Sequence, residues 1–344
     1  MTFMKLTNET VFRGHPDKVC DQISDAILDA YLAQDPLTRC GVEVMGGKSA
    51  VYITGEVTSA ATVDIEAVAQ RVLRDVGYDP SLPIVVDISP QSPDIAMGTN
   101  PTVGGAGDNG MMFGYACSET DQGLPKAMVI LQDFAEEYDL LRQRNEYFLP
   151  DGKAQLTGVY DANGNLLDVD TFTVCYQNRE IRREWTDGII MDMVGDLLHR
   201  YGLRFPHRLL INPTGRFRLG GFEADAGLTG RKLAVDNYHA FCRIGGGAFS
   251  GKDPSKVDRS AAYKARQLAV RWLKEYHLQW CEVQLSYSIG VAQPMAIYVR
   301  TDVDSLVITP SEADYAECEP ARIIKDLDLL KPQYEQLARF GHFR

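Results

Sequence analysis

The residues best suited to chemistry lie in a run of glycines, lysines and carboxylates at 245–260, GGGAFSGKDPSKVDRS. The run contains G-x-x-x-x-G-K, the phosphate-cradling loop of many nucleotide hydrolases, but Asp253 follows Lys252 where that loop has Ser or Thr for Mg²⁺. A proline comes next, which delays the following helix to near Lys256. We therefore interpret the match to the hydrolase loop as a coincidence. Lysines for phosphate oxygens and a carboxylate, Asp258, for Mg²⁺ still predict a polyphosphate site.

A second candidate group stands at the start of a predicted helix, in RGHPDKVCDQISDAILDAYLAQDP (13–36). Pro16 suits the first turn of a helix, and apolar residues recur after it at helical spacing. His15, Asp17 and Lys18 would then lie at the positive end of this helix, where anions bind readily. For His15 and Asp17 the sequence leaves two interpretations open, anion binding and simple capping of the helix.

The same helix carries three aspartates spaced by four residues, Asp21, Asp25 and Asp29. Residues at this spacing share one helical face. A solvated acidic face is the favoured interpretation of the three, and a metal site is the alternative.

Two glycine-rich segments add further cations, GGAGDNGMMFGYA (104–116) and NPTGRFRLGGFEADAGLTGRK (212–232). Glycines at this density form tight turns or let backbone amides approach a ligand, and for either segment alone turns are favoured. Arg216, Arg231 and Lys232 change the balance, because they stand among the glycines of the second segment. A chain handling a highly charged phosphate would need such cations.

The bulk composition limits the classes of partner. The 344 residues carry 35 Lys and Arg against 47 Asp and Glu, a formal charge of −12, which disfavours general binding to nucleic acid or anionic membranes. We expect no membrane span and no signal peptide. The seven cysteines form no C-x-x-C pair, so we expect neither zinc nor a disulfide framework, but reduced, mostly buried thiols in a cytoplasmic protein.

Hydrophobic patterning predicts the elements that must position these residues. Strand pairs are expected over 40–58, around Asn163-Gly164 as a type I′ turn, and over 281–301; amphipathic helices are expected over 64–77, 181–202 and 254–276. Ser255 and Asp258 resemble a capping pair for the last helix. Repetition of strand pair and helix predicts an α+β protein of three similar units, with helices packed on mixed or antiparallel sheets.

The residues alone thus indicate a Mg²⁺-dependent enzyme that handles a nucleotide or polyphosphate, and they do not name the second substrate. The segments GHPDKVCDQISDAILDAYLAQDP, GEVTSAATVDIE, QSPDI, GAGDNGMMFGYA, INPTGRF, DAGLTGRK and GGGAFSGKDPSKVDRSAAY closely resemble, in this order, those of S-adenosylmethionine synthetase (methionine adenosyltransferase). The resemblance runs through most of the chain. The first and last segments are its most specific parts.

The resemblance implies a fold, a reaction and partners. It implies three α/β domains with pseudo-threefold symmetry, at 1–104, 105–217 and 218–344, and a homodimer, often paired into a tetramer, with active sites between subunits. In the implied reaction, methionine sulfur attacks C5′ of ATP and displaces triphosphate, which is then cleaved to pyrophosphate and phosphate. Mg²⁺, two ions per site, and K⁺ are the implied cofactors.

The resemblance also assigns roles to matched positions. The implied ATP contacts are His15, Asp151, Lys153, Arg216, Phe217, Asp225, Arg231, Lys232, Ala248 and Lys252. The implied methionine contacts are Glu56, Gln91, Asp225 and Lys256. The implied metal ligands are Asp17 and Asp258 for Mg²⁺ and Glu43 for K⁺. The implied catalytic residues, which would stabilise the departing triphosphate and the new sulfonium, are His15, Asp225, Arg231, Lys252 and Lys256.

The chain departs from the family at several positions. The loop at 92–104, which begins within QSPDI, is shorter than the family's mobile gate, and Gly152 in DGK is expected to add backbone freedom. These departures leave two alternatives to S-adenosylmethionine synthesis, a relative that accepts a methionine analogue and a regulatory paralog without turnover. A generic ATPase or kinase is disfavoured, because no Ser or Thr follows Lys252.

Overall fold

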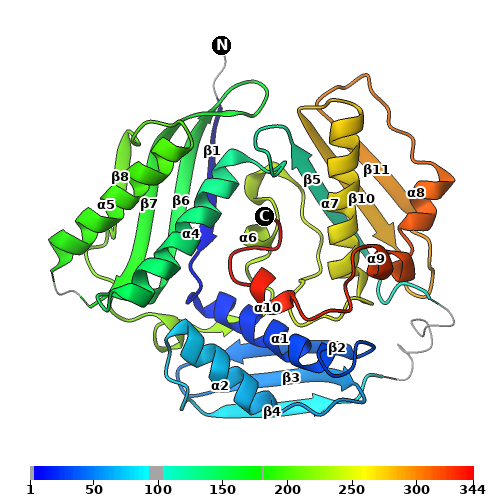
Figure 1. The fold of residues 1–344 in the computed structure, drawn as a ribbon, viewed down its shortest axis with the longest axis horizontal. Helices are drawn as coiled ribbons and strands as arrows, with labels where there is room; N and C mark the ends of the chain where they lie inside the picture. Colours follow the sequence, from blue (N-terminus) through cyan, green and yellow to red (C-terminus); the bar gives the residue numbers. More distant parts are fainter. Residues whose placement is uncertain (1–3, 93–103, 180–181) are drawn as a thin grey trace.

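The structure, a computed structural model, describes residues 4–92, 104–179 and 182–344. Three β-sheets, each with its own helices, surround the C-terminal segment (Figure 1). The predicted α+β class is confirmed. The gating segment predicted at 92–104 lies, but for its two end residues, outside the described residues.

The first unit carries α1, the helix with the three aspartates spaced by four residues. Its sheet has the order β4-β3-β2-β9, with β2 antiparallel to β3 as the predicted hairpin and β4 parallel to β3. Its elements are α1 (Pro16–Leu32), β2 (Arg39–Gly46), β3 (Val51–Thr58), α2 (Ile65–Val76), β4 (Ile84–Ser89) and β9 (Gly227–Leu228). The predicted stop of α2 is confirmed, because Gly77 caps it with a left-handed φ of 95°.

The second unit has the sheet order β1-β6-β7-β8. Its elements are β1 (Met4–Val11), α4 (Lys126–Arg144), β6 (Phe148–Tyr160), β7 (Leu166–Asn178), α5 (Arg183–Arg200) and β8 (Arg208–Ile211). The strand pair and helix are confirmed, but the type I′ turn is wrong. Such a turn needs positive φ at both central residues, and of Asn163 and Gly164 only Gly164 has it. Instead Asp161 accepts the backbone N–H groups of Asn163 and Asn165 and closes a longer loop.

The third unit has the sheet order β11-β10-β5. Its elements are β5 (Gly110–Cys117), α7 (Val257–Glu275), β10 (Trp280–Tyr287), β11 (Ala296–Thr301), α8 (Glu312–Glu317) and α9 (Pro320–Asp326). The strands and α7 agree with the prediction. The capping pair does not: Lys256 occupies the N-cap position and no side chain caps the helix there.

The sheets take strands from distant parts of the chain. β1 pairs with β6, β5 pairs with β10, and β9 pairs with β2. The division at 104/105 and 217/218 therefore stays a prediction, since no sheet follows it strand by strand. The short elements are η1 (Gly221–Glu223), α6 (Leu233–Asp236), η2 (His239–Phe241) and α10 (Tyr334–Leu337), of which α6 and α10 lie near the centre of Figure 1.

The C-terminal segment holds the three units together at the centre of Figure 1. Asp29 of α1 accepts the backbone N–H groups of Tyr334 and Glu335. Gln132 of α4 donates to the carbonyl of Phe343, and Tyr263 of α7 shares a 2.8 Å hydrogen bond with the Nδ1 atom of His342. One segment thus contacts a helix of every unit.

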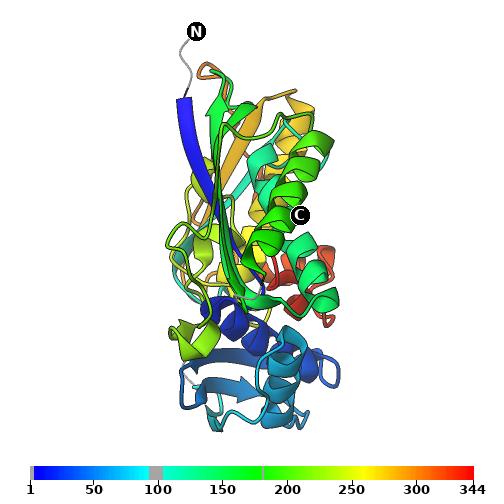
Figure 2. The same cartoon turned by 90° about the vertical axis from the view of Figure 1, so that its left-hand side faces the viewer.

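One face of the first sheet carries exposed apolar side chains. Met45, Tyr52 and Val85 are cross-strand neighbours and are 47%, 44% and 48% exposed. Helices α1 and α2 pack on the other face, where the alternate residues are buried. In the second unit, too, the strands and helices form separate layers when seen from the side (Figure 2).

Two expectations from composition can be compared with the structure. All seven cysteines are free thiols and five are buried, as expected. Among the described residues, no helix has both the length and the apolar character that a bilayer crossing requires.

Candidate active site

The start of helix α1 gathers one group of predicted site residues. His15 is the N-cap, and its Nδ1 atom accepts the backbone N–H of Asp17 at 3.2 Å. The Asp17 carboxylate accepts the ammonium of Lys232 at 2.5 Å and lies 3.7 Å from Nε of Arg231. We call His15, Asp17, Arg231 and Lys232 the first ionic cluster. Both capping and charge clustering are therefore present at this helix end.

Burial and cations keep the imidazole of the first ionic cluster neutral. Burial, together with the charges of Lys232 and Lys153, lowers the pKa of His15 to about 3. Because Nδ1 accepts a hydrogen bond, the proton is assigned to Nε2, which remains a neutral donor. Burial acts to raise the pKa of Asp17, but hydrogen bonds from Lys232 and the Leu228 N–H lower it overall.

Lys18 and the acidic face of α1 differ from their predictions. Lys18 is fully buried and pairs with Asp236 and, at 3.1 Å, with Asp21, so its ammonium faces no ligand. Asp21 and Asp25 are also fully buried, so the solvated acidic face is wrong. Their carboxylates accept backbone N–H groups from loops far away in the sequence, which sequence periodicity alone does not reveal.

The loop before helix α7 gathers a second group of predicted residues. Lys252 donates to Asp258 at 2.6 Å. Lys256 donates to the carbonyl of Cys40 at 2.9 Å and lies 3.8 Å from Glu56. We call Lys252, Lys256, Asp258 and Glu56 the second ionic cluster. Each predicted phosphate cation here is paired with a carboxylate.

Asp253, which replaces the Ser or Thr of the hydrolase loop, has a structural role. Its buried carboxylate accepts the backbone N–H groups of Cys40 at 2.8 Å and Ser255 at 2.9 Å, and lies 3.2 Å from the Lys256 ammonium. Helix α7 begins only at Val257. Both observations support the interpretation that the match to the hydrolase loop is a coincidence.

The predicted nucleotide residues of the central segment lie near the start of β6 and in the loop that follows β8. Asp151 is buried and accepts the backbone N–H of Gly221 at 2.8 Å. Burial raises the pKa of Asp151 to about 6, and the charge of exposed Asp225 acts in the same direction. The carbonyl of Phe217 accepts the Asn178 N–H at 2.9 Å. Lys153 and Arg216 have exposed side chains.

Glycine packing explains two further positions. A Cβ atom on Gly152 would lie 2.4 Å from Cδ2 of Phe12, so this glycine permits close packing rather than backbone freedom. A Cβ atom on Gly230 would lie 2.5 Å from the Cβ atom of Ala248. Ala248, a predicted ATP contact, therefore lies beside the loop that carries Arg231 and Lys232.

The remaining predicted residues lie on the first sheet. A Cβ atom on Gly41 would lie 3.3 Å from Cε of Lys256, and exposed Glu43 is the next residue of β2 on this face. Gln91, after β4, donates its backbone N–H to Thr58 at 3.0 Å. No hydrogen bond or ion pair among the described residues joins the first ionic cluster to the second.

The side chains available as metal ligands can be compared with what Mg²⁺ requires. Within the described parts of the chain, no three His, Cys, Asp or Glu side chains are grouped so as to hold a metal alone. Asp17 and Asp258 each offer one carboxylate. This fits Mg²⁺, which is commonly bound by one or two carboxylates together with substrate phosphates and water.

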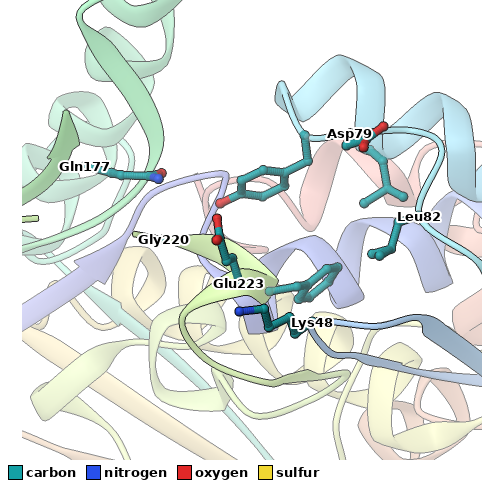
Figure 3. A pocket seen from close by; sticks show the side chains of 9 residues that line it. Lys48, Asp79, Leu82, Gln177, Gly220 and Glu223 are labelled. Carbon is teal, nitrogen blue, oxygen red and sulfur yellow. The ribbon is translucent and has the colours of Figure 1, made fainter. Parts of the chain in front are cut away.

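A cavity of about 390 Å³ lies beside the nucleotide residues, and sequence reasoning gave no sign of it (Figure 3). Its lining includes Tyr78, Gln177, Phe222 and Glu223, and no residue predicted to bind ATP or methionine. The Tyr78 hydroxyl donates to the carbonyl of Gly14, next to His15. The cavity thus borders the site without containing its charges.

The raised pKa of Asp151 predicts a pH-dependent stability effect. A carboxyl whose folded pKa exceeds its unfolded value loses its contribution to stability as pH rises through the folded value, here about 6. Asp151→Asn keeps an acceptor for Gly221 without a buried charge. We expect this variant to be more stable than the parent at pH 8 by about 1–3 kcal/mol, with a smaller gap at pH 4, by urea unfolding.

The matched control is Asp304→Asn, at an exposed aspartate. It should change the free energy of unfolding little at either pH. A gap for Asp151→Asn that stays constant from pH 8 to pH 4 would contradict the assigned burial of charge.

Comparison with protein families covers nearly the whole chain. Residues 3–93, 103–217 and 219–344 match the N-terminal, central and C-terminal domains of S-adenosylmethionine synthetase, respectively. Individual relatives carry the same name. The chain is 42% identical to the S-adenosylmethionine synthase of Nocardioides sp., over all of this chain and 94% of the relative. It is 42% identical to that of Mycoplasmopsis synoviae, over 98% and 91%, and 38% identical to that of Petrotoga mobilis, over 100% and 94%.

These three domain matches and the paired ionic clusters agree with the resemblance found in the sequence. The chain belongs to the S-adenosylmethionine synthetase family.

Proposed function

We propose that the chain synthesises S-adenosylmethionine from ATP and L-methionine, releasing pyrophosphate and phosphate. The pairing of phosphate cations with metal carboxylates in both ionic clusters is the observation that carries this proposal. A triphosphate leaving group develops several negative charges, and catalysis must stabilise them. Sulfur is already a good nucleophile, so positioning and leaving-group electrostatics dominate.

The ion pairs of the two clusters indicate which charged groups would change partners on substrate binding. Lys232 pairs with Asp17, and Lys252 with Asp258, in each case a proposed phosphate cation with a proposed Mg²⁺ ligand. Binding of ATP with its metal would exchange partners, leaving the lysines to the phosphates.

The residues of the first ionic cluster have distinct proposed roles. His15 donates from neutral Nε2 to the triphosphate near the breaking bond. Arg231 and Lys232 neutralise its charge. Mg²⁺ at Asp17 and Asp258 would supply further charge neutralisation on the phosphate oxygens. K⁺ at Glu43 would stabilise the surrounding fold of the site.

The methionine side of the proposed site uses the first sheet. Glu56, in β3, lies 3.8 Å from Lys256. Gln91 follows β4, which pairs with β3, so Glu56 and Gln91 stand at the same end of these two strands. We propose that Glu56, Gln91 and Lys256 hold the amino acid, and that Asp225 stabilises the new positive charge on sulfur. Arg216, Phe217, Asp151 and Lys153 would hold the nucleoside.

We further propose that the active site forms between two copies of the chain. Two observations support this: no hydrogen bond or ion pair joins the two ionic clusters within the described residues, and the row Met45, Tyr52 and Val85 is exposed. Exposed apolar patches mark interaction surfaces. In a two-fold dimer, this surface of one copy would pack against the same surface of the other copy. One copy would supply the first ionic cluster and the other the second.

The activity is tested by mass spectrometry of the products. Purified protein is incubated with ATP, L-methionine, Mg²⁺ and K⁺. S-adenosylmethionine with pyrophosphate and phosphate is the expected result. Absence of any sulfonium product, in protein that still binds ATP, would overturn the proposed function, and a better yield with a methionine analogue would redirect it.

The shared site predicts that two inactive chains restore each other. His15→Asn damages the first ionic cluster and Lys252→Ala the second. A mixed dimer, purified through two different tags, has one site with both changes and one with neither, so we expect about half of the parental activity. Each variant alone should be nearly inactive. If both clusters served one site within a chain, the mixed dimer would be as inactive as its parents.

A further inference from the structure

Two fully buried aspartates of helix α1 make the same unusual contact. Asp21 accepts the backbone N–H of Gly230 at 2.8 Å, and Asp25 accepts that of Gly251 at 2.8 Å. Each glycine has a φ of +80°. Each also stands immediately before a cation of the proposed site, Arg231 in one case and Lys252 in the other.

Neither glycine can be replaced by another residue in this conformation. The Cβ atom of a larger residue at Gly251 would lie 1.9 Å from the carbonyl oxygen of Val42, and at Gly230 it would lie 2.5 Å from the Cβ atom of Ala248. Glycine adopts this left-handed backbone conformation readily, whereas residues with a Cβ atom disfavour it. The backbone conformation of both loops beside α1 therefore depends on glycine, and the hydrogen bonds from the glycine N–H groups to the aspartates fix the position of each loop.

Each aspartate has a buried cation of its own. The ammonium of Lys18 lies 3.1 Å from the carboxylate of Asp21. The guanidinium of Arg259 donates two hydrogen bonds, of 2.8 and 2.6 Å, to the two carboxylate oxygens of Asp25. Arg259 also donates to the carbonyl of Lys252 at 3.0 Å and stacks on the ring of Tyr334 at 4.4 Å. The backbone of Lys252 is thus held from both sides, at the Gly251 N–H and at its own carbonyl.

We propose that Asp21, Asp25 and Arg259 are positioning residues, which set the place of the phosphate cations Arg231 and Lys252 through the backbone of the preceding glycines. They do not touch the substrate. Helix α1 thus anchors both loops, each through the carboxylate of one aspartate. This inference rests on the proposed function for its catalytic readout, and it adds residues to which the sequence had given a solvent-facing or no role.

Arg259→Lys is the most informative change. Lysine keeps the positive charge beside Asp25, but one ammonium does not reproduce the fork and the bond to the Lys252 carbonyl together. Because small misplacements of catalytic groups are costly, we expect kcat to fall about tenfold to a hundredfold. The KM for methionine should stay within about twofold, since the methionine residues are untouched.

A double-mutant cycle separates positioning from general structural damage. If Arg259 acts through Lys252, Arg259→Lys should change kcat less than about twofold in a Lys252→Ala background. An equal fold-loss in both backgrounds would overturn the proposal. So would an unchanged kcat in the single variant. The matched control is Arg271→Lys, the same change on the same helix, where the guanidinium binds Asp314 and Glu317 away from the site.

A second arm covers the case in which Arg259→Lys does not fold. Asp21→Asn keeps an acceptor for Gly230 and is tested against Arg231→Ala in the same way. Here too, loss of kcat that persists in full after Arg231 is removed would reject the proposal.

A binding readout makes this inference separable from the proposed function. Inorganic tripolyphosphate is titrated into parent and variants by calorimetry. If the parent forms no sulfonium product, the proposed function fails, yet a weaker tripolyphosphate affinity in Arg259→Lys, absent in the Lys252→Ala background, would still support positioning. Equal affinity in parent and Arg259→Lys would overturn it.

Discussion

Replacement of Lys252 by alanine is expected to lower kcat/KM for ATP by about two to three orders of magnitude, because the ammonium stabilises charge that develops on the departing triphosphate. The side chain is 25% exposed and pairs with Asp258. Its loss removes no core packing, so the fold should remain. Steady-state assays of S-adenosylmethionine formation and of tripolyphosphate hydrolysis should both show the loss, since both steps act on the same phosphate chain.

Lys274→Ala provides the control for Lys252→Ala. Lys274 lies in the last turn of α7 with an exposed side chain, and its removal should leave the rate within about twofold. A rate for Lys252→Ala within tenfold of the parent would remove Lys252 from the catalytic set. It would also remove the main reason to place a phosphate at residues 245–260.

The second large effect concerns the imidazole at the start of α1. Asparagine in place of His15 can still accept the Asp17 N–H, because it is among the preferred N-cap residues, so the helix start is preserved. Its amide N–H groups stand closer to the backbone than Nε2 of histidine, so the donor that the hydrogen bond on Nδ1 leaves free for the substrate is lost from that position. We expect His15→Asn to slow sulfonium formation by about a hundredfold or more.

Hydrolysis of added tripolyphosphate should suffer much less in His15→Asn, by under about tenfold, because the proposed contact of His15 lies at the C5′–O bond. The two rates are measured on the same preparation, with far-ultraviolet circular dichroism to verify the helix. Equal losses in the two assays would contradict the role assigned to His15. The pKa of about 3 also means that protonation of His15 should affect neither assay between pH 6 and 8.

Local patterning sufficed for much of the secondary structure. Helices α2 and α7 follow an apolar period of 3.6 residues, and the β2–β3 hairpin follows an alternation of two. The partner of a strand is different, because it depends on residues outside any local window. Nothing near Met4–Val11 indicates that β1 pairs with β6, and nothing near Gly110–Cys117 indicates β10.

The candidate site divides in the same way. Lys252 and Asp258 lie six residues apart and were predicted as neighbours from spacing at the start of a helix. Lys232 and Asp17 are 215 residues apart, and only the family resemblance brought them together. The aspartates of α1 were misread for a physical reason: a polar stripe on a helix indicates solvent unless loops from elsewhere cover it, as the loops at Gly230 and Gly251 do.

The exchange of strands among the three sheets has a consequence for how the chain reaches and loses its structure. The β2–β3 hairpin can close early, but the ladder of β5 with β10 joins residues as distant as Gly110 and Tyr287, and such closures are slow. No unit is complete until a segment of another has arrived. We therefore expect heat or urea to unfold the molecule in a single cooperative step, because the unfolding of one unit removes a strand from the sheet of another.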